Sequence, residues 1–165
     1  MIVIGKTIMA IPMLAILIFS APQSESRFGE WMRDWLLCGP FQLQTLPNNT
    51  PDGVHIPGFE TDYLQAHGGE TSPRVRAGQV ETYAGGSATW IAHTAPEFSV
   101  NLDKAVSDKA FVLAYAYREF NWPREETVVL ALGSNDGGRA WLNGERIWDR
   151  PEARCAPTVW SCGNR

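Results

Sequence analysis

The residues best suited to binding a ligand occupy one short stretch, residues 139–148, which has the sequence RAWLNGERIW. Asn143 and Gly144 lie between two alternating segments, and both tolerate the positive φ that the central residues of a type I′ turn require. The stretch therefore predicts a two-residue β-hairpin. In the simplest register, one face of this hairpin carries two indoles and two guanidinium groups: Arg139, Trp141, Arg146 and Trp148. Indoles can stack on the apolar faces of sugars while arginines bind hydroxyl groups, so this face is a candidate ligand platform.

The same register defines the partners across the hairpin. It pairs Leu142 with Glu145, Trp141 with Arg146, Ala140 with Ile147, and Arg139 with Trp148. Ala140, Leu142 and Ile147 then point to the core. Two other interpretations of the Trp–Arg face stay open. The rings and guanidinium groups can stack on each other, with each pair contributing about 0.5–1 kcal/mol, or another strand or domain can cover them.

Asn135 and Asp136 precede the hairpin and are followed by two glycines. This composition is typical of a β-turn. The side-chain oxygens of Asn135 and Asp136 are also suited to binding sugar hydroxyls or Ca²⁺, so both residues join the ligand-binding candidates. The sequence leaves metal binding open and indicates no cofactor other than this candidate Ca²⁺.

The rest of the sequence contains little that indicates catalysis. The three histidines are scattered, and the sequence has no His-Glu-x-x-His zinc motif, Gly-x-Ser-x-Gly elbow or phosphate-binding glycine loop. A retaining glycosidase would need two carboxylates about 5 Å apart. The acids that could supply them are interpreted as turn or surface residues: Asp62, Glu70, Asp136 and Glu145. We therefore predict that the chain by itself is not an enzyme.

The elements that must position these residues are short strands separated by turns. Besides the hairpin, the pattern predicts a helical turn at residues 58–64 and five strands, at residues 34–38, 90–93, 98–102, 111–117 and 127–132. The first strand is expected to stop at Gly39-Pro40, and the last is apolar throughout, as in a central strand. The predicted fold class is all-β, a β-sandwich or jelly roll.

Four segments occur in the order and spacing of a known kind of module: WLLCGPF (35–41), GFETDYL (58–64), AYAY (114–117) and LGSNDGGRAWLNG (132–144). From about residue 31 to residue 151 the chain resembles the galactose-binding-domain-like β-sandwich modules of secreted bacterial proteins, which include glycoside hydrolases and other polysaccharide-processing enzymes. The resemblance implies a jelly roll with a carbohydrate-related accessory role. Such modules continue with further strands after the hairpin, so truncation at the C-terminal end is an open interpretation.

The domain organisation follows from the two ends of the chain. Residues 1–26 contain Lys6, an apolar run and a small-residue exit, which predict a signal peptide, with an uncleaved membrane anchor as the alternative. We expect a β-sandwich module at residues 27–151 and an irregular tail at residues 152–165. The protein is then secreted or periplasmic, with no stable membrane span after cleavage.

The charge of the chain excludes one class of partner, and its cysteines allow one disulfide. With 14 Lys and Arg against 18 Asp and Glu and a pI near 5.3, the chain has no basic surface for nucleic acid. Cys155 and Cys162 could form a disulfide in an oxidising compartment, which leaves Cys38 as a buried thiol.

The functional hypothesis from the sequence is that the chain is a non-catalytic carbohydrate-binding or accessory module whose partner is a glycan. The alternative is a docking module, the N-terminal fragment of a larger secreted glycoside hydrolase or related enzyme, which packs against an adjacent catalytic domain.

Overall fold

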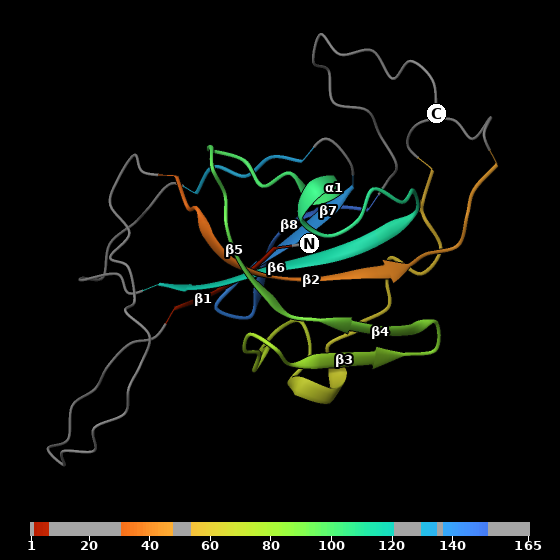
Figure 1. Cartoon of the computed structure of the whole chain (residues 1–165), viewed down its shortest axis with the longest axis horizontal. Coiled ribbons are helices and arrows are strands. Elements are labelled where there is room, and N and C mark those ends of the chain that lie inside the picture. The colour runs from red at the N-terminus through yellow and green to blue at the C-terminus, as the bar shows by residue number, and fades with distance from the viewer. Residues whose placement is uncertain (1, 7–30, 48–53, 121–129, 135–136, 152–165) are drawn as a thin grey trace, which may run out of the picture.

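The computed structural model describes residues 2–6, 31–47, 54–120, 130–134 and 137–151. These residues form a six-stranded sheet in the order β5-β2-β6-β1-β7-β8 and a separate two-stranded sheet, β3-β4 (Figure 1). The strands are β1 (Ile2–Lys6), β2 (Asp34–Gln42), β3 (Val80–Tyr83), β4 (Gly86–Thr89), β5 (Ile91–Thr94), β6 (Val112–Phe120), β7 (Gly138–Leu142) and β8 (Glu145–Arg150). Helix in the described residues is limited to η1 (Gln65–His67) and α1 (Leu102–Ala105). The predicted all-β class is therefore confirmed.

The main core lies between the two sheets. Figure 1 shows β3 and β4 below β2 and β6, with η1 beside them. The buried side chains between these layers form one cluster: Cys38, Phe41, Leu43, Phe59, Leu64, Ala88, Trp90, Leu113, Tyr115, Tyr117 and Trp141. Two packed layers fit a β-sandwich in general terms, and the jelly-roll order of strands remains a prediction.

Strand β2 is longer than the sequence predicts. It pairs antiparallel with both β5 and β6. The expected stop at Gly39-Pro40 is wrong, because the register shifts between Cys38 and Phe41 and the strand continues as far as Gln42. A bulge of this kind takes residues out of the ladder without ending the strand. It returns Phe41 to the core, where it is completely buried.

Two other predicted strands are not observed as such. The range 98–102 runs into α1, whose N-cap Asn101 accepts a hydrogen bond from the Lys104 backbone N–H (3.0 Å). Phe98 is 62% exposed, so the apolar alternation there has no sheet face to cover. In the predicted strand at 127–132, residues 130–132 are not in a strand, and residues 127–129 lie outside the described residues.

The predicted hairpin is present in β7 and β8, which pair antiparallel. Asn143 and Gly144 have φ values of 53° and 83°, and both central residues of a type I′ turn need positive φ. The local turn chemistry therefore sets this connection, as expected. The two pairs nearest the turn are also confirmed: Leu142 with Glu145, and Trp141 with Arg146.

The two pairs further from the turn differ from the prediction. A register shift after Ala140 places this residue opposite Trp148, and Arg139 lies opposite Asp149. Because side chains alternate between faces, a one-residue shift moves Trp148 away from the face of Arg139. Ile147, expected in the core, is 42% exposed. The predicted assignment of faces on β8 is therefore wrong beyond the bulge.

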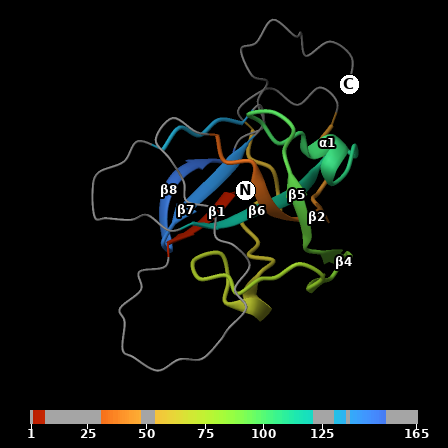
Figure 2. The same cartoon turned by 60° about the vertical axis from the view of Figure 1, so that its left-hand side comes forward.

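Strand β1 lies between β6 and β7 and pairs parallel with both of them (Figure 2). It belongs to the segment predicted to be a signal peptide, and the remainder of that segment, residues 7–26, lies outside the described residues. No described helix has the length and hydropathy of a membrane span. The tail at residues 152–165, with Cys155 and Cys162, also lies outside the described residues.

Candidate functional site

The structure separates the four hairpin residues that were predicted to form a ligand platform. Arg139 and Trp141 are buried, with exposed fractions of 6% and 5%. Trp148 packs on Gly138, since a Cβ on that glycine would lie 2.5 Å from the indole. Arg146 is exposed. The four side chains therefore do not share one open face.

Arg139 instead forms ion pairs with one acid of the opposite strand β8 and one acid of the preceding loop. Its Nε donates to Asp149 Oδ1 (2.8 Å) and its Nη2 donates to Glu60 Oε1. Its Cζ also lies 5.0 Å from the centre of the Phe59 ring. Desolvation acts to lower the pKa of Arg139, but the hydrogen bonds to the two carboxylates raise it above its ordinary value. Arg139 therefore joins the loop at residues 59–60 to the hairpin.

The predicted turn residues Asn135 and Asp136 lie outside the described residues. Their roles in binding sugar hydroxyls or Ca²⁺ remain predictions. Elsewhere, in the described part of the chain, no group of three or more His, Cys, Asp or Glu is placed to hold a metal ion.

A second polar cluster surrounds Glu81, which is 1% exposed. Its Oε1 accepts hydrogen bonds from Trp90 Nε1 (2.8 Å) and Gln79 Nε2 (3.1 Å), and its Oε2 lies 2.8 Å from His67 Nδ1. A buried carboxylate is costly unless it is hydrogen-bonded, and these partners supply its hydrogen bonds. The cluster ties β3 to η1 and to the residue between β4 and β5.

Glu70, predicted to be a turn or surface acid, lies in a turn and is half-buried. Its Oε1 accepts from the Tyr115 hydroxyl (2.8 Å), which itself accepts from the Tyr63 backbone N–H (3.2 Å). Burial raises the pKa of Glu70 to about 7; the Tyr115 hydrogen bond acts in the opposite direction, and the charge of Asp62 adds to the rise. Asp62 accepts from the backbone N–H groups of Leu64 (2.9 Å) and Glu70 (3.2 Å). These bonds hold the segment 61–70 against β6.

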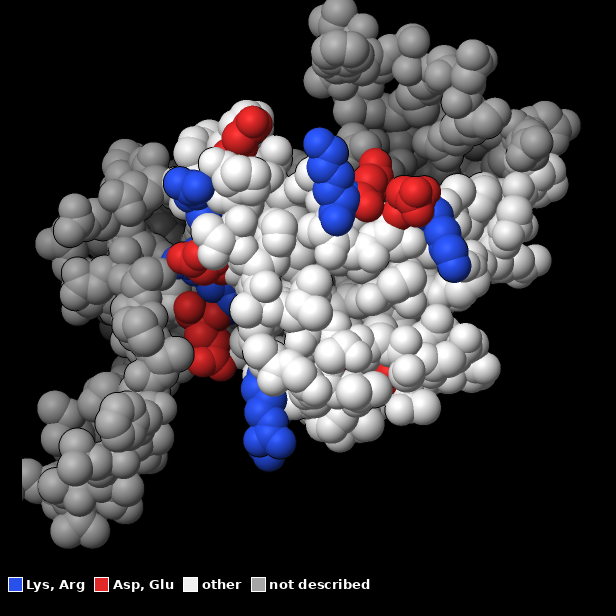
Figure 3. Space-filling model, in the orientation of Figure 1, with Lys and Arg blue, Asp and Glu red and all other residues white. Residues whose placement is uncertain are grey.

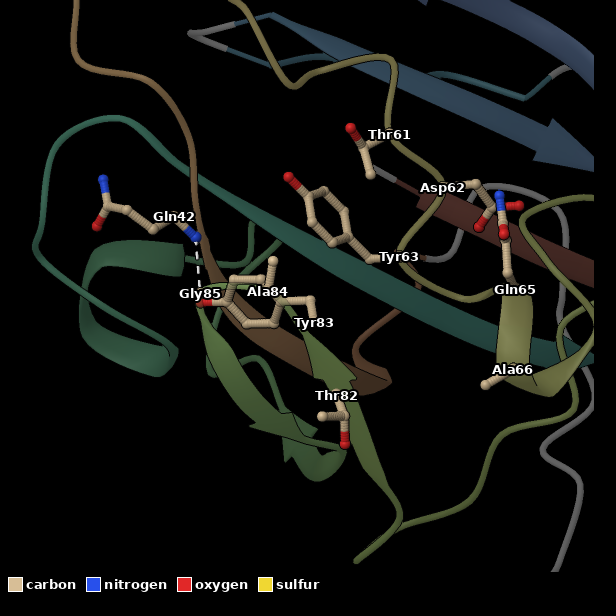
Figure 4. Close-up of a pocket in the computed structure, with 10 residues that line it drawn as sticks. All are labelled: Gln42, Thr61, Asp62, Tyr63, Gln65, Ala66, Thr82, Tyr83, Ala84 and Gly85. Carbon is tan, nitrogen blue, oxygen red and sulfur yellow. Dashed lines mark hydrogen bonds between the residues drawn. The ribbon is translucent and has the colours of Figure 1, made fainter.

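That segment forms one wall of a surface groove with a volume of about 500 Å³. Residues 61–63, 65 and 66 line this wall, residues 82–85 at the β3–β4 turn line the other, and Gln42 completes the lining. Figure 4 shows Tyr63 near the centre, with Gln42 on one side and Asp62 and Gln65 on the other. We call this feature the tyrosine groove. Its volume lies within the range of about 300–1,000 Å³ usual for small-ligand sites.

Two half-buried aromatic rings give the tyrosine groove its apolar surface. Tyr63 stacks on the buried Phe41 ring, with centroids 4.7 Å apart and planes 29° apart. Tyr83 meets Tyr63 edge-on, with centroids 5.6 Å apart and an angle of 85°. Aromatic pairs prefer these offset and T-shaped arrangements. The core therefore holds both rings in place while part of each remains at the surface.

The polar groups of the groove differ in the hydrogen bonds that they already make within the chain. The Tyr83 hydroxyl donates to the Pro40 carbonyl oxygen and accepts from the Gln42 backbone N–H, each at 3.3 Å. The Tyr63 hydroxyl has only a 3.5 Å contact to the Gly58 carbonyl oxygen among the described residues. Three exposed side chains of the groove make no hydrogen bond within the described ranges: Thr61, Gln65 and Thr82. The groove thus offers hydroxyl and amide groups to a ligand.

Two glycines allow the walls of the groove to form. Gly69 has a φ of 72°, and a Cβ there would lie 2.8 Å from Asp62 Oδ2. A Cβ on Gly85 would lie 2.6 Å from Tyr83 Cε2, so the tyrosine ring can cross the β3–β4 turn only over glycine.

The sequence pattern did not predict this site. Tyr63 was expected in a helical turn, and no role was predicted for residues 82–85, which are distant in sequence. The available signal was a tyrosine followed by Ala-Gly-Gly at residues 83–86, where the spacing fits a turn between two short strands. Nothing local indicated that this turn would face Tyr63.

No protein-family model, curated protein or solved structure matched the chain in the three comparisons. The resemblance to galactose-binding-domain-like modules therefore remains a prediction from the sequence, and the function is argued from the site.

Proposed function

We propose that the chain is a non-catalytic, exported accessory module that binds carbohydrate, and that the glycan occupies the tyrosine groove. The observation that supports this most strongly is the composition of the groove. Two half-buried tyrosine rings lie beside hydroxyl and amide groups that have no partner within the described residues. Sugars present apolar C–H faces and vicinal hydroxyl groups, which match aromatic rings and uncharged polar side chains respectively.

The acids near the groove support binding rather than hydrolysis. Asp62 lines the groove, and its two carboxylate oxygens accept backbone hydrogen bonds from Leu64 and Glu70. Glu70 lies behind the groove, where its carboxyl group accepts from Tyr115. Glycoside hydrolysis needs two carboxyl groups that flank the bond to be cleaved. The described lining provides one carboxyl group, that of Asp62, and both of its oxygens already accept hydrogen bonds.

The fold proposed with this function is a jelly-roll sandwich similar to the galactose-binding-domain-like modules. Export rests on Lys6 and the apolar run that follows it. Cleavage after residue 26 would remove β1 together with the leader. N-terminal sequencing of the protein after export tests this proposal: a first residue near 27 supports cleavage, and a protein that retains residue 1 supports the uncleaved anchor.

A binding experiment with matched variants tests the proposed function. The full chain would be titrated against soluble polysaccharides by affinity electrophoresis, together with Tyr63→Ala and the control Trp31→Ala. Trp31 is 62% exposed and packs on Phe98, away from the groove lining. We expect saturable binding that falls at least tenfold in the Tyr63 variant and is unchanged in the control. Absence of binding to every glycan would favour the docking alternative.

Because Tyr63 packs on Phe41, its replacement also removes core contacts. Gln65→Ala and Thr82→Ala provide a second test, since both side chains are exposed and lack hydrogen-bond partners in the described residues. We expect each to weaken binding severalfold without lowering the denaturation temperature. Full binding by both variants would contradict the assignment to the tyrosine groove.

A further inference from the structure

We infer that the tyrosine groove selects neutral glycan segments and rejects acidic ones, such as those with uronic acid or sulfate groups. This inference rests on the proposed function, that the chain binds carbohydrate. It concerns which class of glycan the groove accepts, a choice that the fold alone does not determine.

The lining of the groove carries almost no charge. Among the residues that line the groove, Asp62 is the single charged side chain, and none is Lys, Arg or His. Binding of carboxylate or sulfate groups depends on charge-assisted hydrogen bonds, most often from arginine. An acidic glycan would therefore lose hydration of its charged groups in the groove without gaining a cationic partner.

The one charged side chain in the lining, Asp62, is negative and is fixed in place. The Asp62 carboxylate accepts from two backbone N–H groups, those of Leu64 at 2.9 Å and Glu70 at 3.2 Å. Gly69 packs closely against the same carboxylate. These contacts prevent the side chain from turning away from an approaching anion. A like charge held at this wall disfavours an acidic ligand.

Arg139, the buried cation of β7, is committed elsewhere. Arg139 pairs with Glu60 and Asp149 beneath the hairpin and does not line the groove. On the face of the molecule in Figure 3, most charged side chains lie above and to the left, the surface over β3 and β4 is almost uncharged, and one basic side chain projects from the edge below. A single basic side chain at this edge is not the kind of basic patch that attracts an acidic polymer.

The polar side chains of the groove match neutral hydroxyl groups. Thr61, Gln65 and Thr82 each offer both a donor and an acceptor, as a sugar hydroxyl does. The Tyr63 hydroxyl is also weakly engaged, at 3.5 Å from its carbonyl partner. A neutral sugar can satisfy these groups and place an apolar face on the Tyr63 ring at the same time. Such a site needs no ion for binding.

A comparison of neutral and acidic probes tests the inference. The full chain would be titrated against xylan-, glucan- and galactan-derived oligosaccharides and against polygalacturonate and chondroitin sulfate, at low and at physiological salt. We expect binding to at least one neutral probe that changes less than twofold with salt, and at least tenfold weaker binding to both acidic probes.

Two charge-adding variants make the test specific to the groove. Gln65→Lys places a cation in the lining, and Ser99→Lys places the same charge on an exposed residue next to Phe98, outside the lining. We expect Gln65→Lys to strengthen binding of polygalacturonate by about fivefold at low salt, consistent with about 1 kcal/mol for one charge pair in water. The Ser99 variant should change it less than twofold.

The outcomes separate the inference from the function on which it rests. A chain that binds no probe of either class overturns both. A chain that binds an acidic probe more tightly than every neutral one overturns the inference and leaves carbohydrate binding standing. Equal gains from Gln65→Lys and Ser99→Lys would show that acidic probes respond to overall charge, which also contradicts selection by the groove.

Discussion

Replacing Glu70 by Gln isolates one carboxyl group whose ionisation opposes folding. Glu70 accepts a hydrogen bond from the Tyr115 hydroxyl, and burial raises its pKa from 4.5 to about 7. Glutamine has nearly the same shape, and its amide oxygen can still accept from Tyr115, but it cannot ionise. The substitution therefore removes a pH-dependent contribution to stability while it preserves the packing that supports residues 61–70.

The expected magnitude follows from the shift in pKa. Because the pKa of Glu70 is higher in the folded chain, the protonated form favours folding. This contribution is complete below about pH 4.5 and is lost as the pH rises through about 7. With each pKa unit equivalent to about 1.4 kcal/mol, the full loss is about 3 kcal/mol.

Urea denaturation followed by tryptophan fluorescence, at intervals from about pH 4 to about pH 8, measures this effect. The stability of Glu70→Gln relative to wild type should rise by about 3 kcal/mol over that interval. Glu97→Gln is the control, because Glu97 is an exposed carboxylate without a partner among the described residues. A difference between Glu70→Gln and wild type that stays constant with pH would refute the reasoning.

Three further perturbations follow from the contacts. Gly138→Ala should lower the free energy of unfolding by about 1–3 kcal/mol, because its Cβ would meet the Trp148 ring at 2.5 Å; thermal denaturation measures this, and an unchanged midpoint would contradict the packing. Burial raises the pKa of the Cys38 thiol to about 12, so it should react with a thiol reagent only on unfolding, and rapid labelling of the native chain would contradict its burial. Removing residues 1–26 takes away β1, so backbone amides of β6 and β7 should exchange faster with solvent in that shortened chain; identical exchange would show that β1 does not protect them.

Much of the hairpin could be predicted because the turn is specified locally. Asn143 and Gly144 suit positive φ whatever surrounds them, and the pairs next to the turn follow from its geometry. The bulge that places Ala140 opposite Trp148 depends on tertiary packing, including the indole over Gly138. The alternation of apolar and polar residues does not indicate such a bulge. The predicted assignment of faces on β8 was therefore wrong beyond it.

The burial of the candidate platform also depends on distant parts of the chain. Arg139 is paired with Glu60, which is far away in the sequence, and no local pattern relates the two. Spacing alone can place Arg139 and Trp141 on one face but cannot show what covers that face. The tyrosine groove was missed for the same reason, because its walls come from two segments, distant in sequence, that meet only in the folded chain.

Hydrogen exchange of the full chain with and without a saturating neutral glycan tests the central claim most directly. If the glycan lies in the tyrosine groove, backbone amides of residues 61–66 and 82–85 should exchange more slowly in its presence. Amides of β8, at residues 145–150, should exchange at the same rate in both samples. Protection confined to the hairpin, or to neither region while the glycan is bound, would contradict the account.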